Sequence, residues 1–307
     1  MPAGELHAVT GVAGYTGKYI ARLLLENGQR VLSLSGHPQR PHEFGEQVKV
    51  APFNFDRPDA LAASLKGVVT LYNTYWVRFS YRNISFGKAV ENTITLVRAA
   101  EAAGVQRIVH VSITNPSPDS MLPYFRGKSL LEQVVRQSRL SYAILRPTVI
   151  FGLEDILINN MAYLLRKFPV FAIPGDGGYS LQPIYVGDMA QLAVQAGQEK
   201  GSVIMDAVGP EIYTFEGLAR LLAGVVKSRA ILLHLPPALA LTLARGLGMV
   251  FQDVMLTRDE IDGLMAGLLV SSQPPTGKTL LSTWLEQNAD RVGKRYASEV
   301  KRHFQER

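Results

Sequence analysis

The sequence predicts an α/β protein in which a doubly wound parallel sheet is joined to a smaller, mainly helical lobe. Two observations predict the sheet. Short β-branched runs alternate with helical patterns over about the first 150 residues, and these runs are apolar on both faces. A third observation marks where the alternation ends, because glycine and proline cluster at residues 174–178 and helical patterns dominate afterwards.

The chain begins with a predicted strand, a glycine turn and a helix. The apolar run Leu6–Val9 predicts the strand, and residues at helical spacing predict the helix up to Asn27-Gly28. Between them lie Gly11, Gly14 and Gly17. Gly11 permits a tight exit from the strand, Gly14 lets a pyrophosphate approach the backbone, and Gly17 lets the helix pack closely. The N–H groups at the helix start favour an anion, so the stretch predicts a dinucleotide site. The alternative is an α/β unit that binds nothing there.

The remaining elements of the sheet follow in order. Strands are predicted at residues 30–35, 47–53, 68–72, 108–111 and 142–145, and helices at 59–65 and 86–103. Residues 115–123 are predicted to form a proline-rich loop, followed by a helix through about Ser138. Because the strands are parallel, their carboxyl ends share one edge, which is where open α/β sheets bind ligands.

The domain boundary is expected near residue 150. We expect residues 1–150 to form a dinucleotide-binding Rossmann domain, with 180–200 woven back into it, and residues 151–307 to form a smaller C-terminal substrate lobe. In that lobe Thr214 is expected to cap a helix that ends near Val226, and residues 259–269 predict another helix. The segment 275–279 contains the Gly-Lys-Thr of a P-loop but lacks its first glycine, so it is predicted to be a turn.

Composition excludes several classes of function. The chain has 307 residues, of which 47% are hydrophobic and 19% charged, as in ordinary globular proteins. Its formal charge of +6 is dispersed, and acids interrupt the basic stretch 291–307, which favours a solvated face over nucleic-acid binding. There are no cysteines and the six histidines are scattered, so no metal site is expected.

Location and assembly are less constrained. The N-terminus leads directly into a strand without a basic and apolar leader, so the cytoplasm is expected. His234, two prolines and Arg245 interrupt the apolar stretch 231–251, which argues against a spanning helix. We expect a buried strand followed by a helix there, with surface attachment to a membrane as the alternative. A monomer and a homodimer both remain open.

The end of the second strand indicates which nicotinamide cofactor binds. An acidic residue there would accept the ribose 2′-hydroxyl and repel a 2′-phosphate, but residues 33–40 contain no Asp or Glu. Ser35 and His37 can donate hydrogen bonds, and Arg40 can pair with a phosphate. The segment therefore favours NADP(H) over NAD(H). In the alternative, Arg40 is solvated and backbone groups alone hold the ribose.

The next two strand ends add candidate cofactor contacts. Asn54 and Phe55 follow the third strand, where an amide and an apolar wall suit adenine. Asn73 and Thr74 end the fourth strand, where backbone groups can line the nicotinamide half. All these positions lie at carboxyl ends of parallel strands, so each of them adds support for one cofactor site at this edge of the sheet.

A tyrosine and a lysine form the candidate catalytic pair. Tyr124 and Lys128 are four residues apart at a helix start and therefore share a face. A nearby ammonium lowers the pKa of a phenol, which is about 10 when unperturbed, and such a tyrosine can exchange a proton with a substrate oxygen. Ser112, with Thr114 as its substitute, can hydrogen-bond the same oxygen. The alternative is a chance Tyr-x-x-x-Lys spacing without catalysis.

These motifs together resemble a known superfamily. The chain looks like a short-chain dehydrogenase/reductase of the extended or atypical kind. It is most similar to the NmrA-like proteins, to the NADPH-binding accessory subunit of respiratory complex I and, more broadly, to epimerase/dehydratase-like members. The segments that carry the resemblance span about the first 190 residues in the order of the family: 10–17, 103–112, 124–128, 145–152 and 184–190.

The resemblance implies roles for individual residues. It implies that Lys128 bridges the nicotinamide ribose and Tyr124. It also implies binding residues for the pyrophosphate (Gly11, Gly14, Tyr15, Thr16), the adenine (Asn54, Phe55) and the nicotinamide (Pro147, Thr148).

The sequence departs from the family pattern in two places. Ser112 is followed by Ile113 and Thr114 and not by a second serine. The segment 72–79 is bulky and aromatic where relatives have small residues, so it predicts either a substrate floor in which Arg78 binds an acidic group or, preferentially, a filled core edge.

Two functions follow from these motifs. The first is an NADPH-dependent oxidoreductase or epimerase/reductase that acts on a small carbonyl or hydroxyl compound, with Tyr124 as acid/base. The second is a non-catalytic NADP(H)-binding sensor or assembly subunit, one version of which has a quinone or electron-transport partner. Since several relatives of this kind bind the cofactor without known turnover, Tyr124 indicates capacity and not activity.

Overall fold

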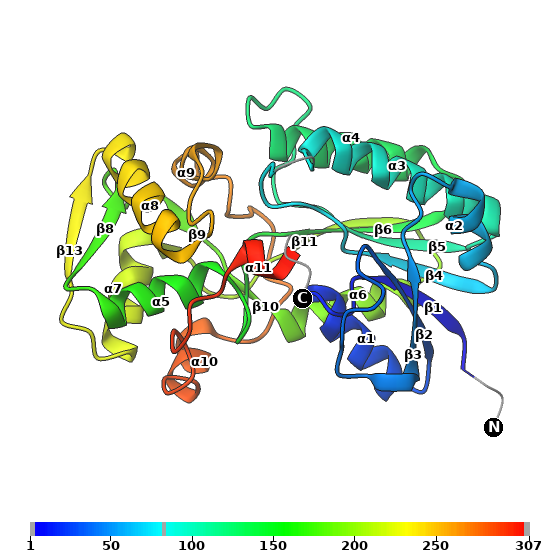
Figure 1. Cartoon of the computed structure of the whole chain (residues 1–307), viewed down its shortest axis with the longest axis horizontal. Coiled ribbons are helices and arrows are strands. Elements are labelled where there is room, and N and C mark those ends of the chain that lie inside the picture. The colour runs from blue at the N-terminus through cyan, green and yellow to red at the C-terminus, as the bar shows by residue number, and fades with distance from the viewer. Residues whose placement is uncertain (1–3, 82–83, 304–307) are drawn as a thin grey trace. The chain divides into compact units, whose positions relative to one another are not determined.

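The first apolar run forms strand β1 (Leu6–Thr10), and six further strands join it in one sheet. The computed structural model describes residues 4–81 and 84–303, and within them the sheet order is β11-β6-β5-β4-β1-β2-β3 (Figure 1). The neighbouring strands from β6 to β3 are parallel, which confirms the predicted doubly wound sheet. These strands are β2 (Arg30–Ser35), β3 (Val48–Pro52), β4 (Val68–Asn73), β5 (Arg107–Val111), β6 (Ser141–Pro147) and β11 (Val203–Ala207).

Helices cover both faces of this sheet (Figure 1). One face carries α1 (Thr16–Glu26) and α6 (Val186–Gln198), and the other carries α2 (Pro58–Ser64), α3 (Phe86–Ala103) and α4 (Pro123–Gln137). The boundaries of α3 are those predicted. The Ser85 side chain accepts from the Lys88 N–H at its start, and Gly104 adopts a left-handed φ of 80° at its end.

The strand order creates a switch point beside β1. The chain runs from β1 outward through β2 to β3 and then returns to the other side of β1 as β4. The connections after β1 and β4 therefore diverge at the carboxyl edge of the sheet. In open α/β sheets such a divergence is where ligands bind.

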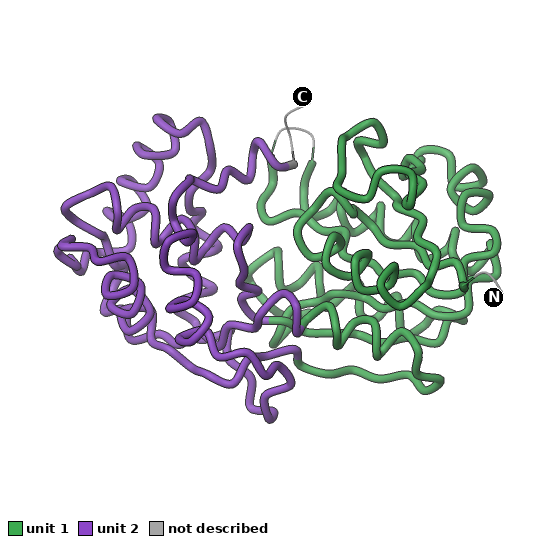
Figure 2. Tube along the Cα trace, turned by 90° about the horizontal axis from the view of Figure 1, so that it is seen from below, with its two compact units in different colours: residues 1–147, 189–206 green, residues 148–188, 207–307 purple. Residues whose placement is uncertain are grey.

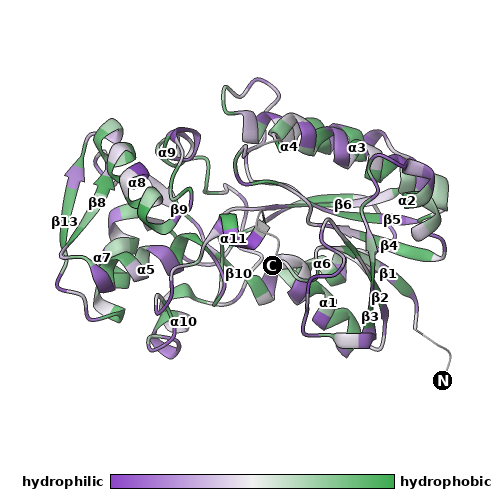
Figure 3. Cartoon of the chain, in the orientation of Figure 1, coloured by the Kyte–Doolittle hydropathy of each residue, from purple (hydrophilic) through white to green (hydrophobic). Residues whose placement is uncertain are grey.

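Both faces of the central strands are buried. Leu71, Ile108 and Ile144 are inaccessible to solvent on one face, and Figure 3 shows the strands of the sheet largely in the hydrophobic colour. On the α6 side, the buried Arg107 guanidinium donates to the Ala196 carbonyl at 2.7 Å. Gly197 is required there, because a Cβ would stand 2.1 Å from the Tyr72 hydroxyl. These contacts fix α6 against the sheet.

The chain divides into two compact units (Figure 2). The first comprises residues 1–147 and 189–206, and the second comprises residues 148–188 and 207–307. The second unit contains helices α5 (Leu157–Lys167), α7 (Phe215–Val225), α8 (Pro237–Phe251), α9 (Arg258–Met265), α10 (Leu281–Gln287) and α11 (Glu299–His303). It also contains the short strands β7 (Ile150–Phe151), β8 (Val170–Pro174), β9 (Ser180–Leu181), β10 (Ile184–Tyr185), β12 (Tyr213–Thr214) and β13 (Ile231–Leu235).

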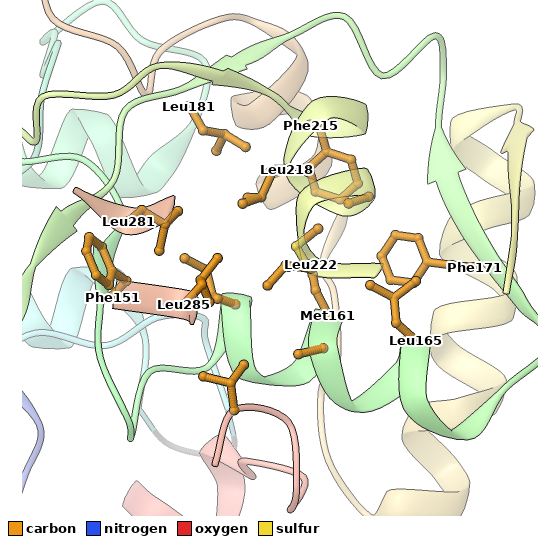
Figure 4. Packing of buried hydrophobic residues seen from close by; sticks show 14 of the residues in the cluster. Phe151, Met161, Leu165, Phe171, Leu181, Phe215, Leu218, Leu222, Leu281 and Leu285 are labelled. Atoms are coloured by element: carbon orange, nitrogen blue, oxygen red, sulfur yellow. The ribbon is translucent and has the colours of Figure 1, made fainter. Parts of the chain in front are cut away.

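The second unit has a hydrophobic core of its own. Figure 4 shows residues of α5, α7 and α10 pointing toward one another, among them Leu165, Leu222 and Leu285. The predicted cap of α7 is present, since the Thr214 hydroxyl accepts from the Gly217 N–H at 2.9 Å. The helix predicted at 259–269 is shorter than expected and ends at Met265, because Gly267 adopts a positive φ of 68°.

The segment with the P-loop-like Gly-Lys-Thr binds a carboxylate of the chain itself. It is irregular, and no hydrogen-bonded turn forms over residues 275–279. The backbone N–H groups of Lys278 and Thr279 each donate to Asp188 at 2.7 Å. The N–H groups that a phosphate would need are thus used within the fold.

The prediction of a buried strand within 231–251 is wrong. A strand (β13) and a helix (α8) do form, but Ile231 is 67% exposed and Leu233 is 46% exposed. The reason is that β13 pairs only with β8 in a two-stranded sheet, so one of its faces stays uncovered. Among the described residues, none of the helices has the length and apolar character needed to span a bilayer.

Candidate dinucleotide site

The glycine turn between β1 and α1 is held from two sides. Gly11 has a φ of +71°, which favours glycine, and its N–H donates to the Leu34 carbonyl of β2 at 2.8 Å. The Gly14 N–H then donates back to the Gly11 carbonyl at 2.8 Å. The buried Ser33 hydroxyl accepts from the Val12 N–H at 3.4 Å. The turn is therefore fixed by its own backbone and by β2.

Only glycine fits at the next two positions of the turn. A Cβ on Gly14 would stand 2.9 Å from the Gly11 carbonyl oxygen, and one on Gly17 would stand 2.6 Å from the same oxygen. Helix α1 begins at Thr16, and Tyr15 at its N-cap makes no side-chain capping bond to it. The helix therefore begins directly after the turn, with the backbone of the turn and of its first residues on one side of the sheet edge. This backbone cradle fits a pyrophosphate.

The loop after β2 gathers three of the predicted cofactor residues. The Ser35 hydroxyl oxygen accepts from the His37 N–H at 3.0 Å, and the Arg40 N–H donates to the His37 carbonyl at 3.0 Å. Ser35, His37 and Arg40 are all partly exposed. The segment 35–40 therefore presents a hydroxyl, an imidazole and a guanidinium and contains no acid.

An aromatic cluster stands at the ends of β3 and β4. Phe53 and Phe55 stack with ring centroids 4.7 Å apart, and Tyr75 contacts both at 5.1 and 5.3 Å. Asn54, between the two phenylalanines, has a φ of 46°, and its Oδ1 accepts from Arg57 at 2.7 Å. Arg57 is not among the predicted residues, although its spacing of three residues from Asn54 in a turn is a local signal for such a contact.

The side chains of Asn73 and Thr74 brace the strands. Asn73 is buried and bonds the His110 Nδ1 of β5 at 3.0 Å. Thr74 exchanges hydrogen bonds with Thr10 of β1, its N–H donating to the Thr10 hydroxyl at 2.7 Å and its hydroxyl to the Thr10 carbonyl at 2.8 Å. Because both side chains are engaged within the fold, only backbone groups at this end of β4 are expected to contact a cofactor.

Lys128 is buried on the helix face that also carries Tyr124. It is 3% exposed, its Nζ donates to the Val111 carbonyl at 2.8 Å, and it lies 4.7 Å from the centroid of the Trp76 ring. Burial lowers the pKa of Lys128 to about 7, while Glu132 opposes the shift. Burial, with Lys128 as a second cause, lowers the pKa of His110 to about 3, so that imidazole is neutral.

Ser112 is directed toward a buried carboxylate. Its hydroxyl donates to Glu132 at 2.6 Å, and Glu132 in turn receives two hydrogen bonds from Arg146, at 2.9 and 2.6 Å. The Thr114 hydroxyl donates to the Arg146 carbonyl at 2.8 Å. Both candidate partners of Tyr124 therefore use their hydroxyl hydrogen within the fold. Glu132 is not among the predicted residues, although it continues the four-residue spacing of Tyr124 and Lys128.

Aromatic rings surround Tyr124. It is partly exposed and meets Trp76 edge-on at 5.6 Å and Phe86 at 5.9 Å. Of the bulky segment after β4, Phe79 is buried in the core, whereas Trp76 and Arg78 are partly exposed.

The two predicted nicotinamide residues fall in different units. Pro147 ends β6, and its carbonyl accepts from the Thr114 N–H at 2.9 Å. Thr148 begins the second unit, where its hydroxyl donates to the Gln182 carbonyl. Over residues 4–81 and 84–303, no three His, Asp or Glu side chains gather as metal ligands.

Comparison with known proteins identifies the class. Residues 11–155 match a family model described as NAD(P)H-binding. Together with the parallel sheet and its glycine turn, this match shows an NAD(P)H-binding Rossmann fold, and the chain is similar to short-chain dehydrogenase/reductase-like proteins of the atypical kind.

Its relatives have diverse roles. Over 289 residues the chain is 26% identical to the mitochondrial NADH dehydrogenase (ubiquinone) 1 alpha subcomplex subunit 9 of Arabidopsis thaliana, covering 88% of this chain and 72% of that protein. It is 26% identical to the ceramide reductase of Caulobacter vibrioides, covering 75% and 73% of the two chains. The NADPH-dependent quinone oxidoreductase of Escherichia coli shares the fold, with a TM-score of 0.75, 20% identity and coverage of 92% and 99%.

Proposed function

We propose that the chain binds NADP(H) at the carboxyl edge of its sheet and acts as an accessory or sensing protein that does not turn the cofactor over. The observation that carries this proposal is the hydrogen bond from Ser112 to Glu132. The relative in the NADH dehydrogenase (ubiquinone) 1 alpha subcomplex supports it, because its name describes a subunit of a larger assembly. A partner linked to electron transport is consistent with that similarity.

The geometry around Ser112 disfavours turnover. A serine hydroxyl has a single hydrogen to donate, and here it is given to Glu132. Arg146 fixes the acceptor through two charge-assisted hydrogen bonds, so Glu132 does not rotate away at low cost. A substrate carbonyl beside Tyr124 would therefore lack the second donor that the family pattern places at Ser112.

The cradle and the loop after β2 support the choice of cofactor. Gly14 and Gly17 let the turn and α1 close tightly on the Gly11 carbonyl, and backbone N–H groups at the start of α1 would supply the donors for a pyrophosphate. Arg40 and Ser35 would bind a 2′-phosphate, which no acid at this strand end would repel. When bound, NADPH would supply a hydride donor at its nicotinamide.

An oxidoreductase is the second candidate. It is favoured by Tyr124, which is partly exposed one helical turn from Lys128. In this case Tyr124 would exchange a proton with the oxygen of a small carbonyl or hydroxyl compound, and Lys128 would stabilise the phenolate. The similarity to the ceramide reductase supports this candidate.

Oxidation of bound NADPH distinguishes the two candidates. The protein is mixed with NADPH and a panel of aldehydes, ketones and quinones, and absorbance at the nicotinamide band is followed for wild type and Tyr124→Phe. We expect equal NADPH affinity for both proteins and oxidation no faster than without protein. Oxidation by wild type that Tyr124→Phe abolishes would overturn the accessory role and establish the enzyme.

A further inference from the structure

The indole of Trp76 contacts both candidate catalytic side chains of α4 and also the Phe86 ring at the start of α3. Its ring stacks on Phe86 at 6.0 Å, meets the edge of Tyr124 at 5.6 Å and faces the Lys128 ammonium at 4.7 Å. Trp76 follows β4, so the contact joins the carboxyl edge of the sheet to α4. The indole Nε1 is buried without a hydrogen-bond partner in the described structure, so the ring is held by its faces.

The helix is shaped to receive this ring. Gly127 precedes Lys128 and is buried in α4. A Cβ at Gly127 would stand 2.9 Å from the Cη2 atom of Trp76, which is too close for an ordinary contact. The absence of a side chain at Gly127 therefore lets Trp76 lie flat against the helix beside Lys128. Glycine inside a helix costs about 1 kcal/mol relative to alanine, so its presence here indicates a packing role.

The surroundings of Lys128 leave few groups that stabilise its charge. From β5 it meets the Val111 carbonyl and the neutral His110. From its own helix it is flanked by Tyr124 one turn before and Glu132 one turn after. Glu132 is already bonded to Ser112 and Arg146. The face of Trp76 is a further group whose contact favours the cation, beside the Val111 carbonyl and the Glu132 carboxylate.

We propose that Trp76 is a positioning residue that fixes the Lys128 ammonium over the end of β5 and thereby sets the affinity for the nicotinamide half of NADP(H). The inference rests on the proposed cofactor site, but its first consequence concerns Lys128 alone. A desolvated cation–π contact stabilises the protonated amine, so removing the ring makes the amine easier to deprotonate.

Titration of Lys128 tests the inference without any cofactor. The side-chain amine is followed by NMR of isotope-labelled lysine, with Lys128→Met assigning the signal. In Trp76→Leu we expect the pKa of Lys128 to fall by about one unit, a tenfold change in the protonation constant. Trp76→Phe, which keeps an aromatic face, should recover part of the shift. Phe86→Leu is the matched control, because it removes a neighbouring ring that does not face Lys128, and it should leave the titration within a few tenths of a unit.

Two further measurements complete the test. If Trp76→Leu does not fold, Gly127→Ala replaces it, because its Cβ displaces the ring and should lower the same pKa. NADPH affinity should fall about tenfold in Trp76→Leu and change less than twofold in Phe86→Leu. An unchanged titration of Lys128 in Trp76→Leu, or in Gly127→Ala where that variant replaces it, overturns the inference. Failure of the wild type to bind NADPH contradicts the proposed function, and the lysine titration then decides the role of Trp76 by itself.

Discussion

The Ser112 hydroxyl and the Glu132 carboxylate are joined by a 2.6 Å hydrogen bond, although they come from β5's end and the middle of α4. Arg146, from β6, completes the group with two hydrogen bonds to the same carboxylate. Ser112 and Glu132 are both nearly inaccessible to solvent. The group therefore ties α4 to β6 and to the end of β5.

Removal of Glu132 should destabilise the fold. Glu132→Ala leaves Arg146 without its partner and Ser112 without its acceptor, which should lower the free energy of unfolding by about 3–5 kcal/mol. Ser112→Ala removes a single hydrogen bond and should cost about 1 kcal/mol. Urea denaturation followed by circular dichroism measures both. A Glu132→Ala variant as stable as Ser112→Ala would show that the ion pair is not structural.

Gly17→Ala should disrupt the turn between β1 and α1. Its Cβ would meet the carbonyl oxygens of Gly11 and Thr10 at 2.6 and 2.7 Å, and backbone cannot move aside cheaply. We expect a loss of about 1–3 kcal/mol in stability together with weakened NADPH binding. Gly224→Ala is the matched control in α7, where the Cβ meets nothing within 4 Å, and it should stabilise by about 0.5–1 kcal/mol. Wild-type stability and NADPH affinity in Gly17→Ala would contradict the close packing.

Lys128 should make stability rise with pH above neutrality. Its pKa is about 7 in the folded chain and 10.5 when unperturbed, so between these values the unfolded chain binds the extra proton. The free energy of unfolding then increases with pH across this window. Lys128→Met lacks the titration, so the difference in unfolding free energy, wild type minus variant, should grow from pH 7 to 10. Parallel pH profiles for the two proteins would mean that Lys128 is not perturbed by burial.

Asp188, and not a nucleotide, should occupy the loop at residues 275–279. Asp188→Ala removes the acceptor of the Lys278 and Thr279 N–H groups and should cost about 1–3 kcal/mol. Lys278→Ala keeps the backbone donor and should change stability by no more than about 0.5 kcal/mol. Thermal melts with and without ATP measure both effects. An ATP-dependent stabilisation that Lys278→Ala removes would show a true phosphate loop.

Local patterns were enough to predict most of the sheet domain. The glycine spacing at residues 11–17 and the bounds of α3 depend on backbone geometry and periodicity within a few residues, which the sequence displays directly. The parallel order of the strands follows from their alternation with helices. These features could be read from the sequence because they need no knowledge of distant contacts.

Contacts between distant residues could not be predicted in this way. Ser112 and Glu132 are twenty residues apart, and no local pattern shows that the hydroxyl turns toward the helix. The cation–π contact of Trp76 depends on the missing side chain of Gly127 in another element. The exposure of β13 depends on a two-stranded sheet whose partner lies about sixty residues earlier in the chain. Each of these features is decided by tertiary packing.

The proposed cofactor site is tested by titration of the purified protein with NADPH and NADH, followed by the fluorescence of the bound nicotinamide. We expect saturable binding of NADPH at one site, weaker binding of NADH, and a smaller difference between the two affinities in Arg40→Ala. Binding of neither dinucleotide would contradict the site at the carboxyl edge of the sheet, and equal affinities would contradict the role of Arg40.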